Sequence, residues 1–151
     1  MSEHEVELLL VEDDANDLEL AMRSLRKHHL ANKIHVARDG EEALDFLHAR
    51  GLYAGRAANG LPKVVFLDLK LPKVSGLQVL REMKSDARLR SVPVVVMTSS
   101  GEQRDLVEGY RLGVNSYIQK PIDFDRFQTV VGDLGYYWLV VNKSPPPEAF
   151  K

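Results

Sequence analysis

The sequence predicts an α/β protein built on a parallel sheet with helices on both faces. Five short apolar segments alternate with segments whose apolar residues recur at helical spacing, and we find no internal repeat or dividing linker. This alternation is typical of doubly wound sheets. With 151 residues, 44% of them hydrophobic, the chain is long enough to bury a full core. We expect a single domain over residues 1–141 and a proline-rich tail over residues 142–151.

Each predicted strand is a short apolar run bounded by polar or turn-forming residues. Continuous runs, rather than alternating ones, are expected for strands that are covered on both faces. In chain order these segments are residues 6–11, 33–37, 63–68, 91–98 and 116–119.

Each predicted helix carries apolar residues three or four positions apart, with a start or stop signal at its ends. These segments are residues 15–29, 39–51 (with a stop at Gly51), 75–86, 102–113 and a last helix that begins after Asp123. In the first of them, Leu18, Met22 and Leu25 form the apolar stripe. In the last helix, Gly132 and Gly135 lower the helix propensity, so the sequence does not decide whether its later half is helical.

Composition excludes several classes of function. The net charge of −2 gives no overall basic field for nucleic acid. The chain has no cysteine, which excludes disulfides and thiolate metal sites. No apolar run is long enough to span a membrane, and the acidic first residues lack a signal-peptide core. We therefore expect a cytoplasmic protein that binds neither nucleic acid nor membrane.

Acidic residues follow two of the predicted strands. Glu12 and Asp13 come after the first strand and Asp68 after the third. Ligands of such sheets bind at the carboxyl ends of the strands. In the strand order 2-1-3-4-5 the first and third strands are neighbours, so we expect these three carboxylates to converge. Their oxygen-only set favours Mg²⁺, which would relieve the repulsion between them. Asp14 is instead expected to cap the following helix.

The other strand ends carry residues suited to phosphoryl transfer. A carboxylate beside Mg²⁺, here Asp68, can act as a nucleophile toward phosphorus. Lys120 follows the fifth strand and supplies an ammonium, and Thr98 ends the fourth and supplies a hydroxyl. Both groups can bind the oxygens of a transferring phosphoryl group.

Together these segments resemble the receiver domains of two-component response regulators. The resemblance rests on LLVEDD (9–14), VVFLDLKLPKVSG (64–76), VVVMTSS (94–100) and YIQKP (117–121), and it spans residues 6–134. It implies a flavodoxin-like fold with the strand order 2-1-3-4-5. It also implies that a histidine kinase is the phosphoryl donor, and that the protein turns over no external substrate as an enzyme would.

The resemblance further implies a role for each matching residue. Asp68 is the implied phosphoacceptor and Lys120 the contact to the phosphoryl group, with a cis peptide bond between Lys120 and Pro121. The implied Mg²⁺ ligands are Asp13, Asp68 and the backbone carbonyl of Lys70, with Glu12 acting through water. The implied switch pair is Thr98 and Tyr117, whose ring turns inward on phosphorylation.

Other classes of protein fit these residues less well. Hydrolases with an aspartyl nucleophile carry a second acid two residues on, where this chain has Lys70. In a flavin carrier, Glu12 and Asp13 would repel the phosphate. A pseudo-receiver that only binds partners is expected to lack one of the site carboxylates or the lysine, whereas this chain has all of them. A phosphorelay intermediate and a chemotaxis-like receiver remain open as alternative roles.

The C-terminal segment adds Tyr136, Tyr137 and Trp138, followed by Leu139, Val140 and Val141, to the usual receiver length. Apolar aromatic patches mark interfaces, so we expect a homodimer through this extension, with packing over the sheet edge as the alternative. Together with the long loop 52–62, the extension makes the chain most similar to stand-alone regulators paired with bacterial phytochrome kinases. No output domain is recognised, so signalling is expected to pass through contacts with an unknown downstream protein.

Overall fold

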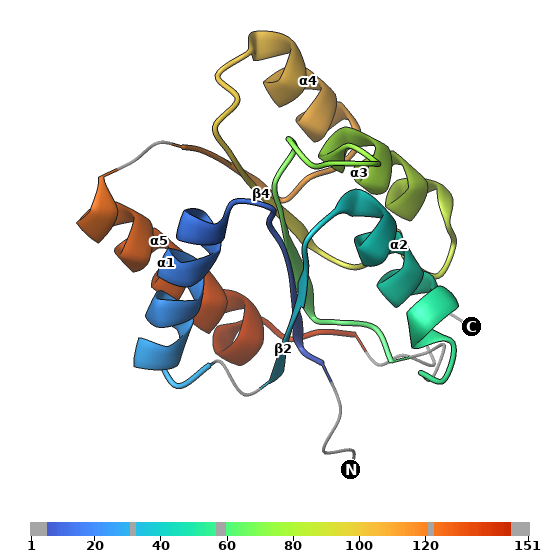
Figure 1. The fold of residues 1–151 in the computed structure, drawn as a ribbon, viewed down its shortest axis with the longest axis horizontal. Helices are drawn as coiled ribbons and strands as arrows, with labels where there is room; N and C mark the ends of the chain where they lie inside the picture. Colours follow the sequence, from blue (N-terminus) through green and yellow to red (C-terminus); the bar gives the residue numbers. More distant parts are fainter. Residues whose placement is uncertain (1–5, 31–32, 57–59, 121–122, 146–151) are drawn as a thin grey trace.

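Five parallel strands form one sheet in the order β2-β1-β3-β4-β5 in the computed structural model, which describes residues 6–30, 33–56, 60–120 and 123–145 (Figure 1). The predicted strand order is therefore confirmed. The strands are β1 (Leu8–Val11), β2 (Ile34–Ala37), β3 (Val64–Leu67), β4 (Val94–Thr98) and β5 (Ser116–Gln119).

Helices cover both faces of this sheet, as Figure 1 shows: α1 and α5 lie on one face and α2, α3 and α4 on the other. Their bounds are α1 (Ala15–Lys27), α2 (Gly40–His48), α3 (Gly76–Ser85), α4 (Gln103–Arg111) and α5 (Phe124–Tyr136). A 3₁₀ turn, η2 (Gly51–Tyr53), follows α2, and a π-helical turn, η3 (Tyr137–Val141), follows α5. Side chains cap four of the helices by accepting the backbone N–H three residues on: Asp14, Asp39, Ser75 and Asp123.

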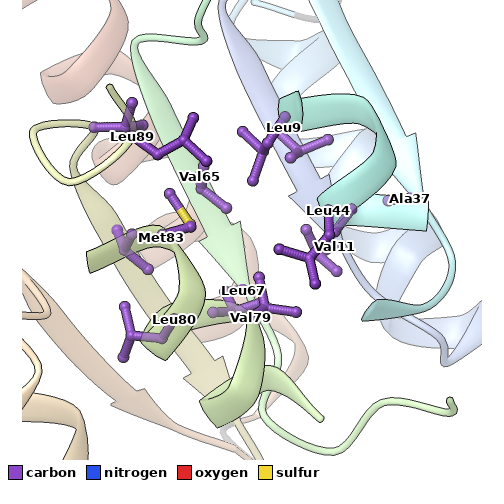
Figure 2. Packing of buried hydrophobic residues seen from close by; sticks show 14 of the residues in the cluster. Leu9, Val11, Ala37, Leu44, Val65, Leu67, Val79, Leu80, Met83 and Leu89 are labelled. Carbon is purple, nitrogen blue, oxygen red and sulfur yellow. The ribbon is translucent and has the colours of Figure 1, made fainter. Parts of the chain in front are cut away.

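The strands supply two apolar layers because successive side chains point to opposite faces. On one face, Leu9, Val11, Val65 and Leu67 pack against α2 and α3 (Figure 2). On the other face, Leu8, Leu10, Val64 and Phe66 pack against α1 and α5. Every residue of β1 and β3 is buried, which explains their continuous apolar runs.

Two element ends differ from the sequence prediction. The fourth strand begins at Val94 rather than at residue 91, because Pro93 has no N–H to donate to the sheet. The second helix ends at His48 rather than near Gly51. There Ala49 adopts a left-handed conformation (φ 54°), which closes the helix before the glycine is reached.

The last helix, whose later half the sequence did not settle, continues through both Gly132 and Gly135. A Cβ atom at Gly132 would lie 2.3 Å from Cε1 of His28, and one at Gly135 would lie 2.7 Å from Cδ2 of Leu25. The two glycines therefore let α5 approach α1 closely, and this packing offsets their low helix propensity.

The C-terminal extension divides between core and surface. Trp138 and Leu139 are partly buried against the apolar layer shared with α1 and α5. Tyr136, Tyr137, Val140 and Val141 remain about half exposed. In the part of the chain that the structure describes, no helix is long and apolar enough to cross a membrane.

Candidate functional site

The sheet register brings the predicted site residues to one edge. Val11 pairs with Leu67, so Glu12 and Asp68 follow neighbouring strands at the same level. The backbone N–H of Asp68 donates to the carbonyl of Val11 at 3.1 Å. On the other side, the N–H of Lys120 donates to the carbonyl of Thr98 at 2.5 Å, which fixes Lys120 at the same edge.

The Lys120 ammonium lies at the centre of an acidic cluster. Its Nζ is 2.8 Å from Oε1 of Glu12, 2.8 Å from Oδ2 of Asp17 and 3.5 Å from Oδ2 of Asp68. Only 4% of Lys120 is exposed to solvent. Paired in this way, each buried charge has a partner of opposite sign, as buried charges require.

The protonation of this cluster follows from burial and pairing. Burial acts to lower the pKa of Lys120, but its hydrogen bonds to Asp17 and Glu12 outweigh burial, and the pKa is raised. Lys120 is therefore a cation. Burial raises the pKa of Glu12 to about 7, although the hydrogen bond to Lys120 opposes the change.

The structure shows the predicted convergence of three carboxylates only in part. Glu12 and Asp68 turn toward Lys120, whereas Asp13 is exposed. Among the described residues, no three Asp, Glu or His side chains are grouped closely enough to hold a metal by themselves. The Lys120 ammonium balances the charge of Glu12 and Asp68, a pairing that the sequence does not predict.

The donor set at this edge nevertheless suits Mg²⁺. The ion is bound through one or two carboxylates and keeps several of its waters, so it needs no cage of three acids. Asp13 is open to solvent and Asp68 lies one strand away. The available side-chain ligands in this set are all oxygens, which fits Mg²⁺ better than zinc.

The loop after β3 holds Asp68 tightly. The N–H of Lys70 donates to Oδ1 of Asp68 at 3.1 Å, and the N–H of Gly76 donates to the carbonyl of Leu69 at 2.9 Å. A Cβ atom at Gly76 would lie 2.2 Å from the carbonyl oxygen of Asp68. The loop can fold back so closely only because residue 76 is a glycine. The side chain of Lys70 is exposed beside the site.

Thr98 and Tyr117 both contact Ser100. Thr98 is fully buried, and its Oγ1 accepts a hydrogen bond from the N–H of Ser100 at 3.2 Å. The Tyr117 hydroxyl donates to the carbonyl of Ser100 at 3.4 Å, and burial raises the pKa of Tyr117. The Ser100 hydroxyl donates to Oδ2 of Asp105 at the start of α4, at 2.5 Å. Ser100 therefore links the two predicted switch residues to α4.

Of the other predicted features, one lies away from this edge and one cannot be described. Tyr136, Tyr137 and Trp138 stand at the end of α5 and are not part of the acidic cluster. The predicted cis bond between Lys120 and Pro121 falls outside the described residues.

Sequence reasoning missed Asp17 and the linking role of Ser100. Asp17 lies in the first turn of α1, where acidic residues are common because they suit the helix dipole. Its one distinguishing signal is its place just after the acidic segment 12–14. Ser100 is a polar residue two positions after Thr98, and nothing in its sequence context reveals a contact with Tyr117.

Known proteins resemble this chain over nearly its whole length. The bacteriophytochrome response regulator AtBRR has a structure with a TM-score of 0.71 and 51% identity, covering 91% of this chain and 98% of AtBRR. The probable methanogenesis regulatory protein FilR2 of Methanothrix harundinacea is 42% identical over 140 residues, which are 93% of this chain and 88% of FilR2.

A third relative is response regulator Rcp1 of Synechocystis sp. It is 34% identical over 138 residues, which are 91% of this chain and 92% of Rcp1. The Mn²⁺-bound crystal structure of Rcp1 gives a TM-score of 0.85 at 33% identity, covering 93% of this chain and 99% of that one.

The family described as the response regulator receiver domain matches residues 8–132. That range contains the whole sheet together with Asp13, Asp68, Thr98 and Lys120. The strand order, the residues at the strand ends and the match agree, and the chain belongs to the response regulator receiver family of two-component signalling proteins.

Proposed function

We propose that this protein is a response regulator that accepts a phosphoryl group on Asp68 from a histidine kinase. The observation that carries the proposal is the place of Asp68 at the carboxyl end of β3, with Oδ2 3.5 Å from the ammonium of Lys120. Both side chains are largely buried, with 9% of Asp68 and 5% of Lys120 exposed to solvent.

The transfer step uses the chain's own groups in distinct roles. An oxygen of Asp68 forms a bond to phosphorus while the P–N bond of the kinase phosphohistidine breaks and the imidazole leaves. Lys120 stays protonated because its pKa is raised, and it stabilises the charge on the phosphoryl oxygens. Thr98 supplies a hydroxyl donor from the end of β4.

Asp13, Asp68 and the carbonyl of Lys70 would hold Mg²⁺, with Glu12 acting through water. When bound, the ion would neutralise part of the charge on the transferring phosphoryl group. A Mn²⁺-bound crystal structure exists for the relative Rcp1, which supports binding of a divalent cation by this chain.

Signalling then passes from Asp68 to the surface formed by α4 and β5. Movement of the Thr98 hydroxyl toward a phosphoryl group disturbs its hydrogen bond with Ser100, which also accepts from Tyr117 and donates to Asp105. The outer face of α4 exposes Leu106, Val107 and Tyr110. A downstream protein that reads this face would sense the change.

A bacterial phytochrome is the proposed kinase. The support is the 51% identity with AtBRR, a bacteriophytochrome response regulator, over 91% of this chain. Red-light-dependent transfer of phosphate from such a kinase to Asp68 is the direct test. If the phosphorylated kinase keeps its phosphate in the presence of this protein, the pairing is wrong while the receiver activity stands.

The proposal includes a homodimer formed through the C-terminal extension. Tyr136 and Tyr137 are 50% and 47% exposed, and Val140 and Val141, which follow them, are also about half exposed. Exposed apolar residues gathered in one segment are typical of an interface. Trp138 contributes by its partly buried ring, which packs edge-on against Tyr137 with ring centroids 5.1 Å apart.

The test of receiver activity is the intact mass after incubation with Mg²⁺ and acetyl phosphate. We expect the chain to gain one phosphoryl group, and we expect the gain to disappear in Asp68→Asn and on addition of a chelator. Asp45→Asn, an exposed ion-pair change on α2, is the matched control and should gain the group normally. No gain by the unaltered chain would indicate a binding module that carries receiver residues.

A further inference from the structure

A hydrogen bond joins Arg38 to the backbone of Asp13. Arg38 follows β2 and directly precedes Asp39, the residue that caps α2. Its Nη2 donates to the carbonyl oxygen of Asp13 at 3.0 Å. We propose that Arg38 is a positioning residue that fixes Asp13 for binding the divalent cation. The inference rests on the proposed function, in which Asp13 is a metal ligand.

Asp13 sits where regular structure does not fix the backbone. The sheet pairing of β1 ends with Val11, and the N–H of Glu12 still donates to the carbonyl of Ala37 at 3.0 Å. The first bond of α1 runs from the N–H of Leu18 to the carbonyl of Asp14, at 2.9 Å. The carbonyl of Asp13 lies between these two patterns, and the guanidinium of Arg38 is its donor.

Arg38 is itself anchored at its backbone. Its N–H donates to Oε1 of Glu42 at 3.0 Å. The other oxygen of Glu42 accepts from the Tyr53 hydroxyl at 2.6 Å, and that hydroxyl lies 3.0 Å from Nε2 of His35. The His35 ring stacks on Phe46, with centroids 4.3 Å apart and planes within 8°. A connected set of contacts therefore runs from the η2 turn to the backbone of Asp13.

Two effects of Arg38 on a cation have opposite signs, so experiment can separate them. As a positive charge near the site, Arg38 repels a divalent cation, and its removal would tighten binding. As a hydrogen-bond donor that orients Asp13, it favours binding, and its removal would weaken it. The exposed position of Arg38 screens its charge, whereas its hydrogen bond is directional. We therefore expect the positioning effect to dominate.

The experiment measures binding of Mn²⁺ to the full chain by the EPR signal of the free ion, with Mg²⁺ as competitor. We expect Arg38→Ala to weaken Mn²⁺ binding by about tenfold, the lower end for groups that orient metal ligands. Arg38→Lys keeps one donor of similar reach and should restore binding to within about threefold. Arg50→Ala is the control. Arg50 follows α2 and forms an exposed ion pair with Asp45, so its removal should leave Mn²⁺ binding as in the unaltered chain.

Phosphorylation by acetyl phosphate gives a second measurement. In Arg38→Ala the Mg²⁺ concentration for half-maximal rate should rise by the same factor as the Mn²⁺ affinity falls, while the rate at saturating Mg²⁺ stays unchanged. A general structural defect would lower the saturated rate as well, and that result would overturn the positioning role.

Unchanged or tighter Mn²⁺ binding in Arg38→Ala would also overturn the inference and leave the proposed function intact. Failure of the unaltered chain both to bind Mn²⁺ and to accept a phosphoryl group would overturn the proposed function and the inference together.

Discussion

Substitution of Gly76 by alanine tests how closely the β3–α3 loop must approach the phosphoacceptor. The added Cβ would lie 2.2 Å from the carbonyl oxygen of Asp68 and 2.5 Å from the Cα of Leu69. Both neighbours are backbone atoms, so neither can be relieved by rotation of a side chain. The loop or the end of β3 must move by about 1 Å to reach ordinary contact distance.

The magnitude follows from two opposing effects. Overpacking of this kind costs about 3 kcal/mol, the upper end for an added methyl group, because backbone must shift. Alanine recovers up to about 1 kcal/mol through its higher helix propensity at the start of α3. The net loss in the free energy of unfolding is about 2 kcal/mol, which lowers Tm by about 4–8 °C for a chain of this size.

The assay is thermal unfolding followed by circular dichroism, together with the rate of phosphorylation by acetyl phosphate. Because the shift falls on Asp68 itself, we expect Gly76→Ala to lower the phosphorylation rate at a temperature where it is fully folded. Gly55→Ala is the control, since a Cβ atom there meets nothing within 4 Å. Equal Tm values for Gly76→Ala and the unaltered chain would refute the reasoning.

Three further predictions concern other parts of the molecule. Tyr53→Phe removes a hydroxyl that is hydrogen-bonded to a carboxylate on α2 and an imidazole on β2, and should lower the free energy of unfolding by about 1–3 kcal/mol in urea titrations; an unchanged midpoint would contradict this. Lys70→Ala removes an exposed cation beside Asp68 and should change the decay rate of the acyl phosphate, measured by loss of the phosphorylated mass, and identical decay would exclude the effect. Joint replacement of Tyr136 and Tyr137 by serine should reduce the mass measured by light scattering from dimer to monomer, and an unchanged dimer would show that other residues hold it.

The residue pattern alone was sufficient to predict the strands, while their order followed from the resemblance to receiver domains. The residues of β1 and β3 are buried on both faces, and only a continuous apolar run satisfies that environment. Parallel strands end at one edge, so the residues that follow them must lie near one another. That geometry predicted the neighbourhood of Asp68 and Lys120 before any side chain was placed.

The arrangement within the site could not be predicted in the same way, because it depends on where each side chain points. Glu12 turns toward Lys120 while the adjacent Asp13 faces solvent, although the two acids look alike in sequence. Asp17 reaches the same lysine from α1, across 103 positions of the chain. A local pattern specifies the place of a residue on an element, whereas such pairs are decided by the relative positions of several elements.

The length of the C-terminal helix also depends on contacts between elements that a local sequence pattern does not predict. This has a consequence for testing the proposed dimer. Gly132 and Gly135 weaken the helix when considered locally, yet they are the positions at which α5 approaches Leu25 on α1 and His28 just after it. The helix continues past both glycines, and Trp138 packs against the α1 and α5 layer of the core. Trp138→Ala should therefore lower stability even in a monomer, so its effect on mass alone would not identify an interface. The exposed tyrosines can be changed without opening that core, which makes them the sharper test of dimerisation.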